Sequence, residues 1–477
     1  MLPPEFLERI KSQAYIDPDA LVRALEVPAV TSVRVNRLKW PELVKRYQPV
    51  EWEPDGYYLP GRPLFTTDPL FHAGVYYPQE SSSMFTGEVF RQLTAGRSGL
   101  RVLDLCGAPG GKSTHLASLV GDDGLLVANE VIRSRVSVLA ENITKWGTGN
   151  VIVTNADPSR FGMLPAFFDV IVADAPCSGE GMFRSAVATR EWSLQNTRLC
   201  SERQRRIVME AWPALRPGGI MIYSTCTFNP AENEENVSWL MEQTGAESLA
   251  VDLPDGSPVV PVRHGKAEGY GFHPGRIKGD GFFIAAIRKS AGMGPGQGGD
   301  ERLTRMNADR GFGSGHSPVV RKGKKGLSGS SSVAFEKAEP VAMFERDRIV
   351  MHDERIIALA AESGLFGYLA ERLPVIKAGT MIGEVKKDSL IPAHDLAMSV
   401  KLRKEAWSRH ELSGEEALAY LRLEAPSPSG MPPGRVLLTY RGAALGFANN
   451  LGSRVNNGFP QAWRIRMERG KQVTEIF

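Results

Sequence analysis

The chain has 477 residues, more than one hydrophobic core usually organises, so we expect two to four domains. Hydrophobic residues make up 42% and charged residues 23% of the sequence, which is typical of a globular protein. No apolar run approaches the roughly 18 residues of a membrane span, and the first residues lack the apolar core of a secretory signal. We therefore expect a cytoplasmic protein without a membrane partner.

The four cysteines are too few for a disulfide framework in a chain of this length. Their spacing matches no zinc-binding pattern, so we expect no metal site. The net charge of +3 is compatible with RNA as a partner, but many proteins without nucleic-acid partners are equally basic. At least one thiol is therefore open to a catalytic role.

Residues 1–80 are predicted to form a small appended domain that binds RNA. Helical patterns at 3–14 and 17–27 precede an alternating apolar pattern at 32–39, which predicts a strand.

From 81 to 290, short apolar runs alternate with amphipathic stretches, which predicts a parallel sheet built from βαβ units. The predicted strands are 100–106, 124–130, 150–157, 168–176, 219–227 and 281–289, with the principal helices at 112–120, 133–146 and 200–215. Fully apolar strands imply burial on both faces. The fold class is thus α/β, a doubly wound and mostly parallel sheet of Rossmann type, with ligands beyond the carboxyl ends of the strands.

Residues 291–332 are rich in glycine and serine, which predicts a linker. Its basic cluster at 321–326 could hold RNA phosphates or be a solvated tether. From 333 to 477 a mixed α/β region returns, and its strand-like runs separated by glycine and asparagine turns predict a compact β-rich module.

A glycine-rich turn with Gly107, Gly110 and Gly111 lies between the first predicted strand and a helix. Glycines let the backbone approach a ligand closely, and the helix N-terminus supplies free N–H groups. A P-loop is excluded, because it needs glycine five positions before Gly111, where this chain has Cys106.

Acidic residues end the second, third and fourth predicted strands, at Glu130, Asp157 and Asp174. The ribose of S-adenosylmethionine needs a carboxylate at the end of the second strand, as dinucleotide ribose does. One such residue is more often a helix or turn cap. Three of them after a glycine-rich turn favour an S-adenosylmethionine site.

Cys177 follows the fourth strand and Cys226 lies near the end of the fifth. If these strands are neighbours, both thiols emerge at the edge of the sheet that holds the cofactor. A thiolate can add to C6 of a cytosine, which makes C5 nucleophilic enough to take a methyl group. Asp174 is the candidate for a hydrogen bond to the base, and it must be protonated if it donates to N3. Cys106 and Cys200 are expected to be buried apolar side chains.

Seven segments resemble the Nop/Sun family of RNA cytosine-5 methyltransferases, and they cover about the first 290 residues. They are SVRVNRLK (32–39), YYPQESSSM (76–84), LDLCGAPGGKS (103–113), NEVIRSR (129–135), DAPCSGEGMF (174–183), YSTCTFNPAENEENV (223–237) and GDGFFIAAIRK (279–289). The resemblance implies a class I methyltransferase fold, with Cys226 as the nucleophile and Cys177 as the thiol that assists product release. The cofactor contacts that it implies are Cys106, Gly107, Ala108, Pro109, Gly110, Gly111, Lys112, Glu130, Asp157 and Asp174, of which Asp174 also faces the base.

The choice between the two thiols is the sharpest open question. DNA cytosine methyltransferases use the cysteine of a Pro-Cys dipeptide, and this chain has Pro176-Cys177. DNA methylation with Cys177 as nucleophile is therefore an alternative, as are the same chemistry on transfer RNA and a non-catalytic RNA-binding factor.

The segment 442–465 resembles the PUA-like RNA-binding module of the bacterial RsmF (YebU) branch, which methylates small-subunit ribosomal RNA. It implies 16S rRNA or the small ribosomal subunit as partner, and we expect no obligate protein partner. The target base must leave its stack to reach the thiols. Arg34, Arg184, Lys278 and Arg454 are candidates to hold the RNA backbone, although each is individually more often a structural surface charge.

Overall fold

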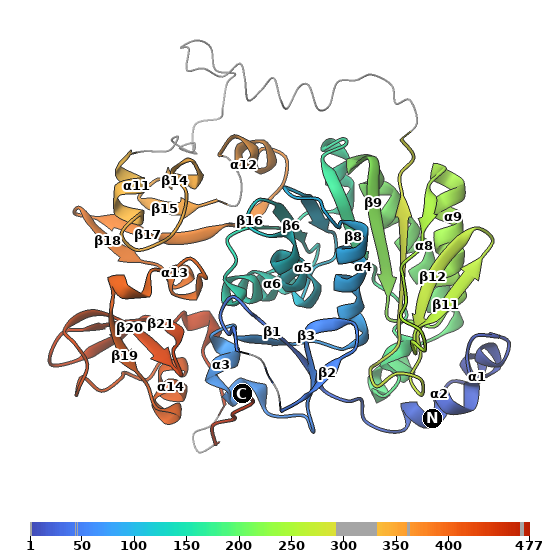
Figure 1. Cartoon of the computed structure of the whole chain (residues 1–477), viewed down its shortest axis with the longest axis horizontal. Coiled ribbons are helices and arrows are strands. Elements are labelled where there is room, and N and C mark those ends of the chain that lie inside the picture. Colours follow the sequence, from blue (N-terminus) through green and yellow to red (C-terminus); the bar gives the residue numbers. More distant parts are fainter. Residues whose placement is uncertain (1, 43, 45, 292–331, 360–362, 468–471) are drawn as a thin grey trace, which may run out of the picture. The chain divides into compact units, whose positions relative to one another are not determined.

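The computed structural model describes residues 2–42, 44, 46–291, 332–359, 363–467 and 472–477. The chain forms two compact units (Figure 1). The first comprises Met1–Pro63, Tyr76–Leu139 and Thr154–Gly292, and the second comprises Leu64–Val75, Ala140–Val153 and Met293–Phe477. The predicted linker at 291–332, with its basic cluster, falls almost entirely outside the described residues. The domain limits at 80, 290 and 332 therefore stay predictions.

The first unit begins with two helices, α1 (Pro4–Lys11) and α2 (Pro18–Leu25), as the sequence predicts. Both start with proline, whose missing N–H is not needed in a first turn. The Asp17 carboxylate accepts from Ala20 N (2.9 Å) and caps α2. A four-stranded sheet follows in the order β2-β3-β1-β4, with β1 (Ser32–Val35), β2 (Gln48–Val50), β3 (Glu53–Tyr58) and β4 (Tyr76–Pro78).

The main sheet of the first unit has the order β11-β12-β13-β9-β8-β5-β6. Its strands are β5 (Arg101–Asp104), β6 (Leu125–Asn129), β8 (Phe168–Asp174), β9 (Leu215–Thr225), β11 (Val260–His264), β12 (Ala267–Phe272) and β13 (Phe282–Arg288), and β10 (Glu247–Leu249) also pairs with β13. Strands β6, β5, β8 and β9 pair in parallel, whereas β13 is antiparallel to β9. The predicted strands of this region are confirmed, including the expected contact between the fourth and fifth.

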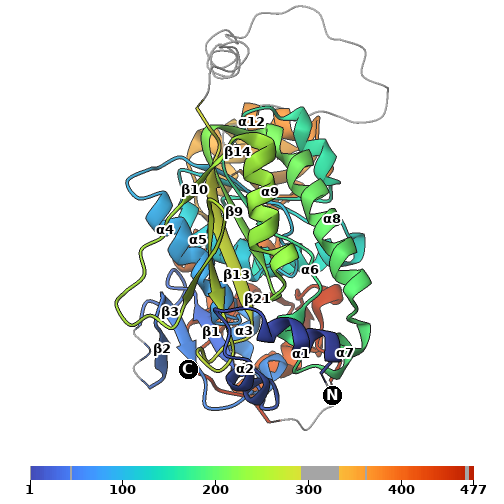
Figure 2. The ribbon, with the colours of Figure 1, turned by 90° about the vertical axis from the view of Figure 1, so that its right-hand side faces the viewer.

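Helices cover both faces of this sheet, as in a doubly wound fold. Figure 2 shows α4 (Phe85–Leu93) and α5 (Gly111–Val120) on one side, with α8 (Leu194–Ala211) and α9 (Glu234–Thr244) on the other. The shorter α7 (Ala186–Glu191) precedes α8, and α6 (Arg133–Trp146) follows β6. Every residue of β6 is buried, as expected for a sheet with two covered faces. Within the described residues, no helix has the length and apolar character needed to cross a membrane.

The second unit contains two four-stranded sheets, ordered β14-β15-β17-β18 and β19-β20-β21-β22. Their strands are β14 (Ile349–His352), β15 (Arg355–Ala358), β17 (Thr380–Lys386), β18 (Ser389–Pro392), β19 (Ser408–Glu411), β20 (Gly434–Tyr440), β21 (Ala443–Asn450) and β22 (Val455–Asn457). Its other elements are α3 (Pro69–His72), β7 (Val151–Thr154), α11 (Ser332–Ala338), α12 (Ser363–Ala370), β16 (Val375–Ala378), α13 (His394–Met398) and α14 (Gly414–Leu421). The β-rich module predicted at the C-terminal end is thus confirmed by β19 to β22.

Candidate active site

The glycine-rich turn joins β5 to α5 and has the shape of a ligand cradle. Gly110 has φ of 119°, a left-handed conformation that L side chains rarely adopt. A Cβ at position 107 would lie 2.6 Å from Ser113 Oγ and 3.3 Å from Asn129 O, so only glycine fits there. Gly107 N donates to Asn129 O at 2.7 Å. The turn is therefore held against the end of β6 without side chains between them.

Asn129 organises the strand ends around this turn. Its amide nitrogen donates to Leu105 O (3.1 Å) and Ala156 O (3.0 Å), and its amide oxygen accepts from Ala156 N (2.9 Å). The side chain is fully buried and joins three chain segments. Sequence reasoning missed this residue, although a polar residue at the end of the apolar run LLVA was a usable signal.

Glu130 follows β6 directly and is 3% exposed. Its Oε1 accepts from Ile132 N at 2.8 Å, and Arg135 Nη1 lies 3.5 Å from its Oε2. Arg135 also donates to Ala108 O (2.7 Å), so it joins this carboxylate to the glycine-rich turn. The apolar Val131 and Ile132 beside it are about half exposed, at 53% and 47%. A buried carboxylate, an adjoining apolar surface and a glycine-rich cradle fit the ribose, adenine and amino-acid parts of S-adenosylmethionine.

Asp157 follows β7 and makes local contacts. Its Oδ1 accepts from Ser159 N (3.1 Å) and Ser159 Oγ (2.6 Å), and these hydrogen bonds lower its pKa. It thereby caps the short 3₁₀ helix at Pro158–Met163, which is the capping alternative considered for such acidic residues. Its exposed position leaves a cofactor contact as a prediction.

Asp174 connects the cofactor turn to the strand that carries the second thiol. It accepts from Lys112 Nζ at 2.9 Å and from Ser224 Oγ at 2.8 Å. Burial lowers the pKa of Lys112, but the Asp174 carboxylate and the Cys226 sulfur raise it more, and the net pKa is above its ordinary value. The Lys112 ammonium thus lies near both Asp174, the predicted contact to cofactor and base, and Cys226, the predicted nucleophile.

The two predicted thiols are in direct contact. Cys177 Sγ lies 3.0 Å from Cys226 Sγ, and Cys226 N donates to Cys177 Sγ at 3.3 Å. Both residues are half-buried. The hydrogen bond with Cys226 and burial raise the pKa of Cys177 well above its ordinary value. The two sulfurs are therefore within hydrogen-bond distance of each other, and either can be the donor.

Not every residue predicted at the site is available to a ligand. Cys200 is buried on α8, as expected for an apolar side chain. The prediction that Arg34 contacts an RNA phosphate is wrong. Arg34 is 2% exposed, and its guanidinium donates to Thr114 Oγ1 (2.7 Å) inside the fold. Arg184 is mostly buried and forms an ion pair with Asp280.

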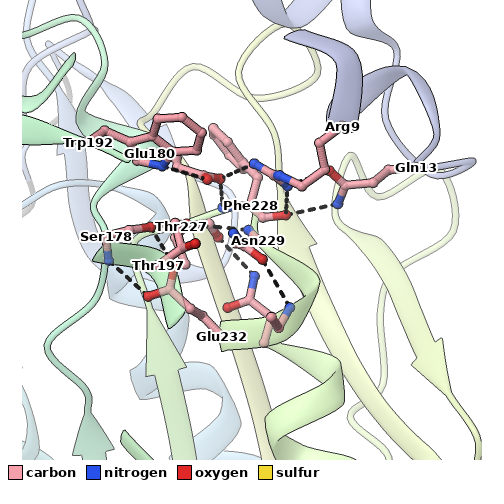
Figure 3. Close-up of polar contacts among 12 residues, drawn as sticks. Arg9, Gln13, Ser178, Glu180, Trp192, Thr197, Thr227, Phe228, Asn229 and Glu232 are labelled. Carbon is pink, nitrogen blue, oxygen red and sulfur yellow. Dashed lines mark hydrogen bonds and ion pairs between the residues drawn. The ribbon is translucent and has the colours of Figure 1, made fainter. Parts of the chain in front are cut away.

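Two buried glutamates in the loops after the cysteines were missed (Figure 3). Glu232 accepts from Ser178 N (2.9 Å), Ser178 Oγ (2.5 Å) and Gln204 Nε2 (3.0 Å). Burial raises the pKa of Glu232 to about 7. Glu180 accepts from Arg9 and Trp192. Both glutamates stand inside the segments DAPCSGEGMF and NPAENE, but their contacts link distant parts of the sequence.

The pKa of Glu232 predicts a pH-dependent stability. The pKa of Glu232 rises from 4.5 to about 7 on folding. The contribution of protonated Glu232 to the free energy of unfolding is therefore fully present below about pH 4.5 and is lost as the pH rises through 7. Glu232→Gln should remove this dependence. Between pH 4.5 and 8, its free energy of unfolding should gain about 3 kcal/mol relative to the unmodified chain. Urea unfolding across this pH range tests it, with the exposed Glu202→Gln as control. Parallel pH curves for Glu232→Gln and the unmodified chain would contradict it.

Three family models match the chain. They are described as 16S rRNA methyltransferase RsmB/F (residues 92–288), the N-terminal domain of 16S rRNA methyltransferase RsmF (2–81) and the methyltransferase RsmF PUA domain (408–465). The ribosomal RNA small subunit methyltransferase F of Erwinia tasmaniensis is 31% identical over 485 residues, which cover 96% of each chain. That of Shewanella baltica is 31% identical over 496 residues, again with 96% of each chain covered. The chain belongs to the RsmF family.

The family confirms the predicted class of enzyme and cofactor. This RsmF-family chain is an S-adenosylmethionine-dependent RNA methyltransferase with a C-terminal PUA domain. Among solved structures, a methyltransferase homologue from Pyrococcus horikoshii is similar with a TM-score of 0.50 and 30% identity. The similarity covers 60% of this chain and all of the other. The fold class predicted from the sequence, with an N-terminal domain and a PUA-like module, is thereby confirmed.

The geometry at Glu130 predicts a loss of cofactor affinity on substitution. A carboxylate that accepts from ribose hydroxyls makes charge-assisted hydrogen bonds, so Glu130→Gln should raise the Kd for S-adenosylmethionine about 10- to 100-fold. Calorimetric titration measures this Kd, and Glu202→Gln on the exposed face of α8 provides the control. An unchanged Kd for Glu130→Gln would remove the residue from the cofactor site.

Proposed function

We propose that this chain transfers a methyl group from S-adenosylmethionine to C5 of a cytosine in 16S rRNA, with Cys226 as the nucleophile. One observation carries the proposal. Two thiols 3.0 Å apart follow adjacent parallel strands, and the Lys112–Asp174 pair lies beside them at the glycine-rich turn. A reacting pyrimidine needs a sulfur nucleophile, an acid or base and a methyl donor at one edge of a sheet, and this edge offers residues for each.

The reaction begins when Cys226 Sγ adds to C6 of the cytosine, which forms an S–C6 bond and raises the electron density at C5. The cofactor supplies an electrophilic methyl group on its sulfonium. Transfer of the methyl group to C5 would leave S-adenosylhomocysteine. Solvent water would then take the C5 proton, and the electrons of that C–H bond would restore the C5–C6 double bond as Cys226 Sγ leaves as a thiolate. Covalent addition thus divides one difficult methylation into easier steps.

The environment of the thiols supports Cys226 over Cys177 as the nucleophile. The raised pKa of Cys177 keeps it protonated. As a thiol it can donate to the Cys226 sulfur when that sulfur leaves the methylated base, which is the release role expected for it. The Lys112 ammonium interacts electrostatically with Cys226 and places a positive charge near that sulfur.

Asp174 supports binding of the base. Both of its carboxylate oxygens accept hydrogen bonds, from Lys112 and Ser224. A hydrogen bond between Asp174 and the Watson–Crick edge of the cytosine requires that one of these contacts be exchanged for the base. Lys112 has the longer and more flexible side chain, so we propose that it moves when the base enters.

The family supports the proposed substrate. The curated relatives are named ribosomal RNA small subunit methyltransferase F, and the matched PUA domain and N-terminal domain are those of a 16S rRNA methyltransferase. We therefore propose 16S rRNA or the small ribosomal subunit in the cytoplasm as the target. Transfer RNA and, with Cys177 as the nucleophile, DNA remain the competing substrates.

Substitution of each cysteine separates these roles. Cys226→Ser should abolish methyl transfer to RNA and form no covalent adduct. Cys177→Ala should also lose turnover, but it should accumulate a protein–RNA adduct that withstands denaturing gel electrophoresis, because release is blocked. Transfer of a tritiated methyl group and the gel shift measure the two steps. Cys200→Ser, at a buried position on α8, is the matched control and should retain activity. Turnover by Cys226→Ser together with loss of adduct in Cys177→Ala would assign the nucleophile to Cys177.

The nucleic-acid target has its own test. Bisulfite sequencing of 16S rRNA from cells with and without the gene should show one or more cytosines that lose protection when the gene is absent. Incubation of purified chain with small subunits from the deletion strain should restore it. Unchanged 16S rRNA, with a lost signal in transfer RNA or DNA, would move the proposal to that substrate.

A further inference from the structure

Glu180 lies three residues after Cys177 and is completely buried in the 3₁₀ turn Glu180–Met182. Its Oε1 accepts from Trp192 Nε1 at 3.0 Å. Its Oε2 accepts from Arg9 Nη2 at 2.6 Å and from Phe228 N at 3.2 Å. One carboxylate thus joins the loop after Cys177 to the loop after Cys226 and to the N-terminal helix α1 (Figure 3).

Both backbone polar groups of Phe228, two residues beyond Cys226, form hydrogen bonds with side chains. Its N–H donates to Glu180, and its carbonyl accepts from Arg9 Nη1 (3.1 Å) and Gln13 Nε2 (2.8 Å). Figure 3 shows Arg9 and Gln13 pointing from α1 and its end toward this carbonyl. The chain segment that follows the proposed nucleophile therefore has little freedom to rotate.

The two loops also meet through their backbones. Gly181 N, next to Glu180, donates to Cys226 O at 2.9 Å. A Cβ at position 181 would lie 2.9 Å from that same carbonyl oxygen and 2.5 Å from Gly281 O. The nucleophile's own peptide is therefore bonded to the residue that adjoins the buried carboxylate.

Apolar packing fixes α1 over this network. Phe6 packs edge-on against Phe183 with ring centroids 4.9 Å apart, and against Trp192 at 6.3 Å. These rings and Phe228 belong to one buried cluster with α1 and α2. The packing of Phe6 holds α1 in place, and α1 in turn holds Arg9 near Glu180 and the Phe228 carbonyl.

We propose that Glu180 and Arg9 are positioning residues that set the distance between the sulfurs of Cys177 and Cys226 for methyl transfer. This inference rests on the proposed function, because it takes Cys226 as the nucleophile and Cys177 as the thiol that donates a hydrogen bond to it on release. Neither residue touches the base. Both act through the backbone of the loops that carry the thiols.

The proximity of the two thiols can be tested without RNA, through the equilibrium constant for forming a disulfide between them. In a glutathione buffer, the two thiols exchange with glutathione disulfide to give a Cys177–Cys226 disulfide and two molecules of reduced glutathione. The equilibrium constant reports how closely the loops hold the thiols. Arg9→Ala and Glu180→Gln should each lower this constant about tenfold, because misplaced loops lose effective concentration. Mass spectrometry of digested chain identifies the linked peptides.

A matched control comes from another buried ion pair of the same unit. Arg91 Nη1 lies 3.0 Å from Glu53 Oε2, and Glu53 is 3% exposed, like the partner of Arg9. Arg91→Ala breaks that pair without removing a contact to either cysteine loop. It should lower the melting temperature as Arg9→Ala does, but leave the disulfide equilibrium as in the unmodified chain.

Kinetics on RNA provide the second readout. Arg9→Ala and Glu180→Gln should lower kcat about tenfold or more while KM for RNA and Kd for S-adenosylmethionine change less than about twofold. The double variant should be no slower than the slower single variant, since both substitutions break one network. Arg9→Lys should recover part of kcat, because it restores a cation beside Glu180.

The outcomes are distinct from those that test the proposed function. An inactive unmodified chain would reject methyl transfer, yet the disulfide equilibrium would still report on the positioning of the thiols. If Arg9→Ala and Glu180→Gln lower only the melting temperature, with the disulfide equilibrium and kcat unchanged, the pair has a structural role and the inference is overturned.

Discussion

The parallel pairing of β8 with β9 sets Asp174 beside Ser224, and the site depends on this register. Two residues beyond Ser224 and three beyond Asp174 the chain reaches Cys226 and Cys177, so the two thiols leave neighbouring strands at the same edge. Side chains alternate between the faces of a strand, and a slip by one residue would turn Ser224 away from Asp174. The buried apolar residues at 170–173 of β8 and 220–223 of β9 favour this register, because a slip by one residue would move them away from their packing partners.

Three buried carboxylates of the first unit are accommodated in two ways, by an ion pair or by a raised pKa together with hydrogen bonds. Glu180 has the Arg9 guanidinium as an ion-pair partner. Glu232 has a pKa raised to about 7 by burial, and it accepts hydrogen bonds from Ser178 and Gln204. Asp104 has a pKa raised to about 6 by burial and accepts from Ser113 Oγ at 2.6 Å. Unpaired buried charge is costly, so each acid needs its own partners. The partners of Glu180 and Glu232 come from other elements of the first unit, so the conformation of both cysteine loops depends on contacts between distant parts of the sequence.

The sequence predicts the elements that have a local residue pattern. It does not predict contacts between residues that are far apart in the chain. The strands β5, β6, β8 and β9 are apolar runs of the right length, and the glycines of the turn at 107–111 stand in a recognisable context. Strand β11 was missed because Pro261 interrupts its pattern and most of its residues are exposed, as is common at a sheet edge. Arg34 was misjudged because charge alone does not reveal that a side chain lies under α5. Arg9 and Glu180 are 171 positions apart, and no local pattern indicates such a pair.

The contacts of α1 change how the N-terminal domain is understood. A domain that only gathered RNA would need a basic outer surface and no particular relation to the thiols. Instead, Arg9 and Gln13 bind the carbonyl of Phe228, and the aromatic ring of Phe6 packs on Phe183 beside the other loop. Both helices α1 and α2 take part in one apolar cluster with these loops. Because the loops cannot keep these contacts without the helices, the N-terminal helices and the two cysteine loops form one packed unit.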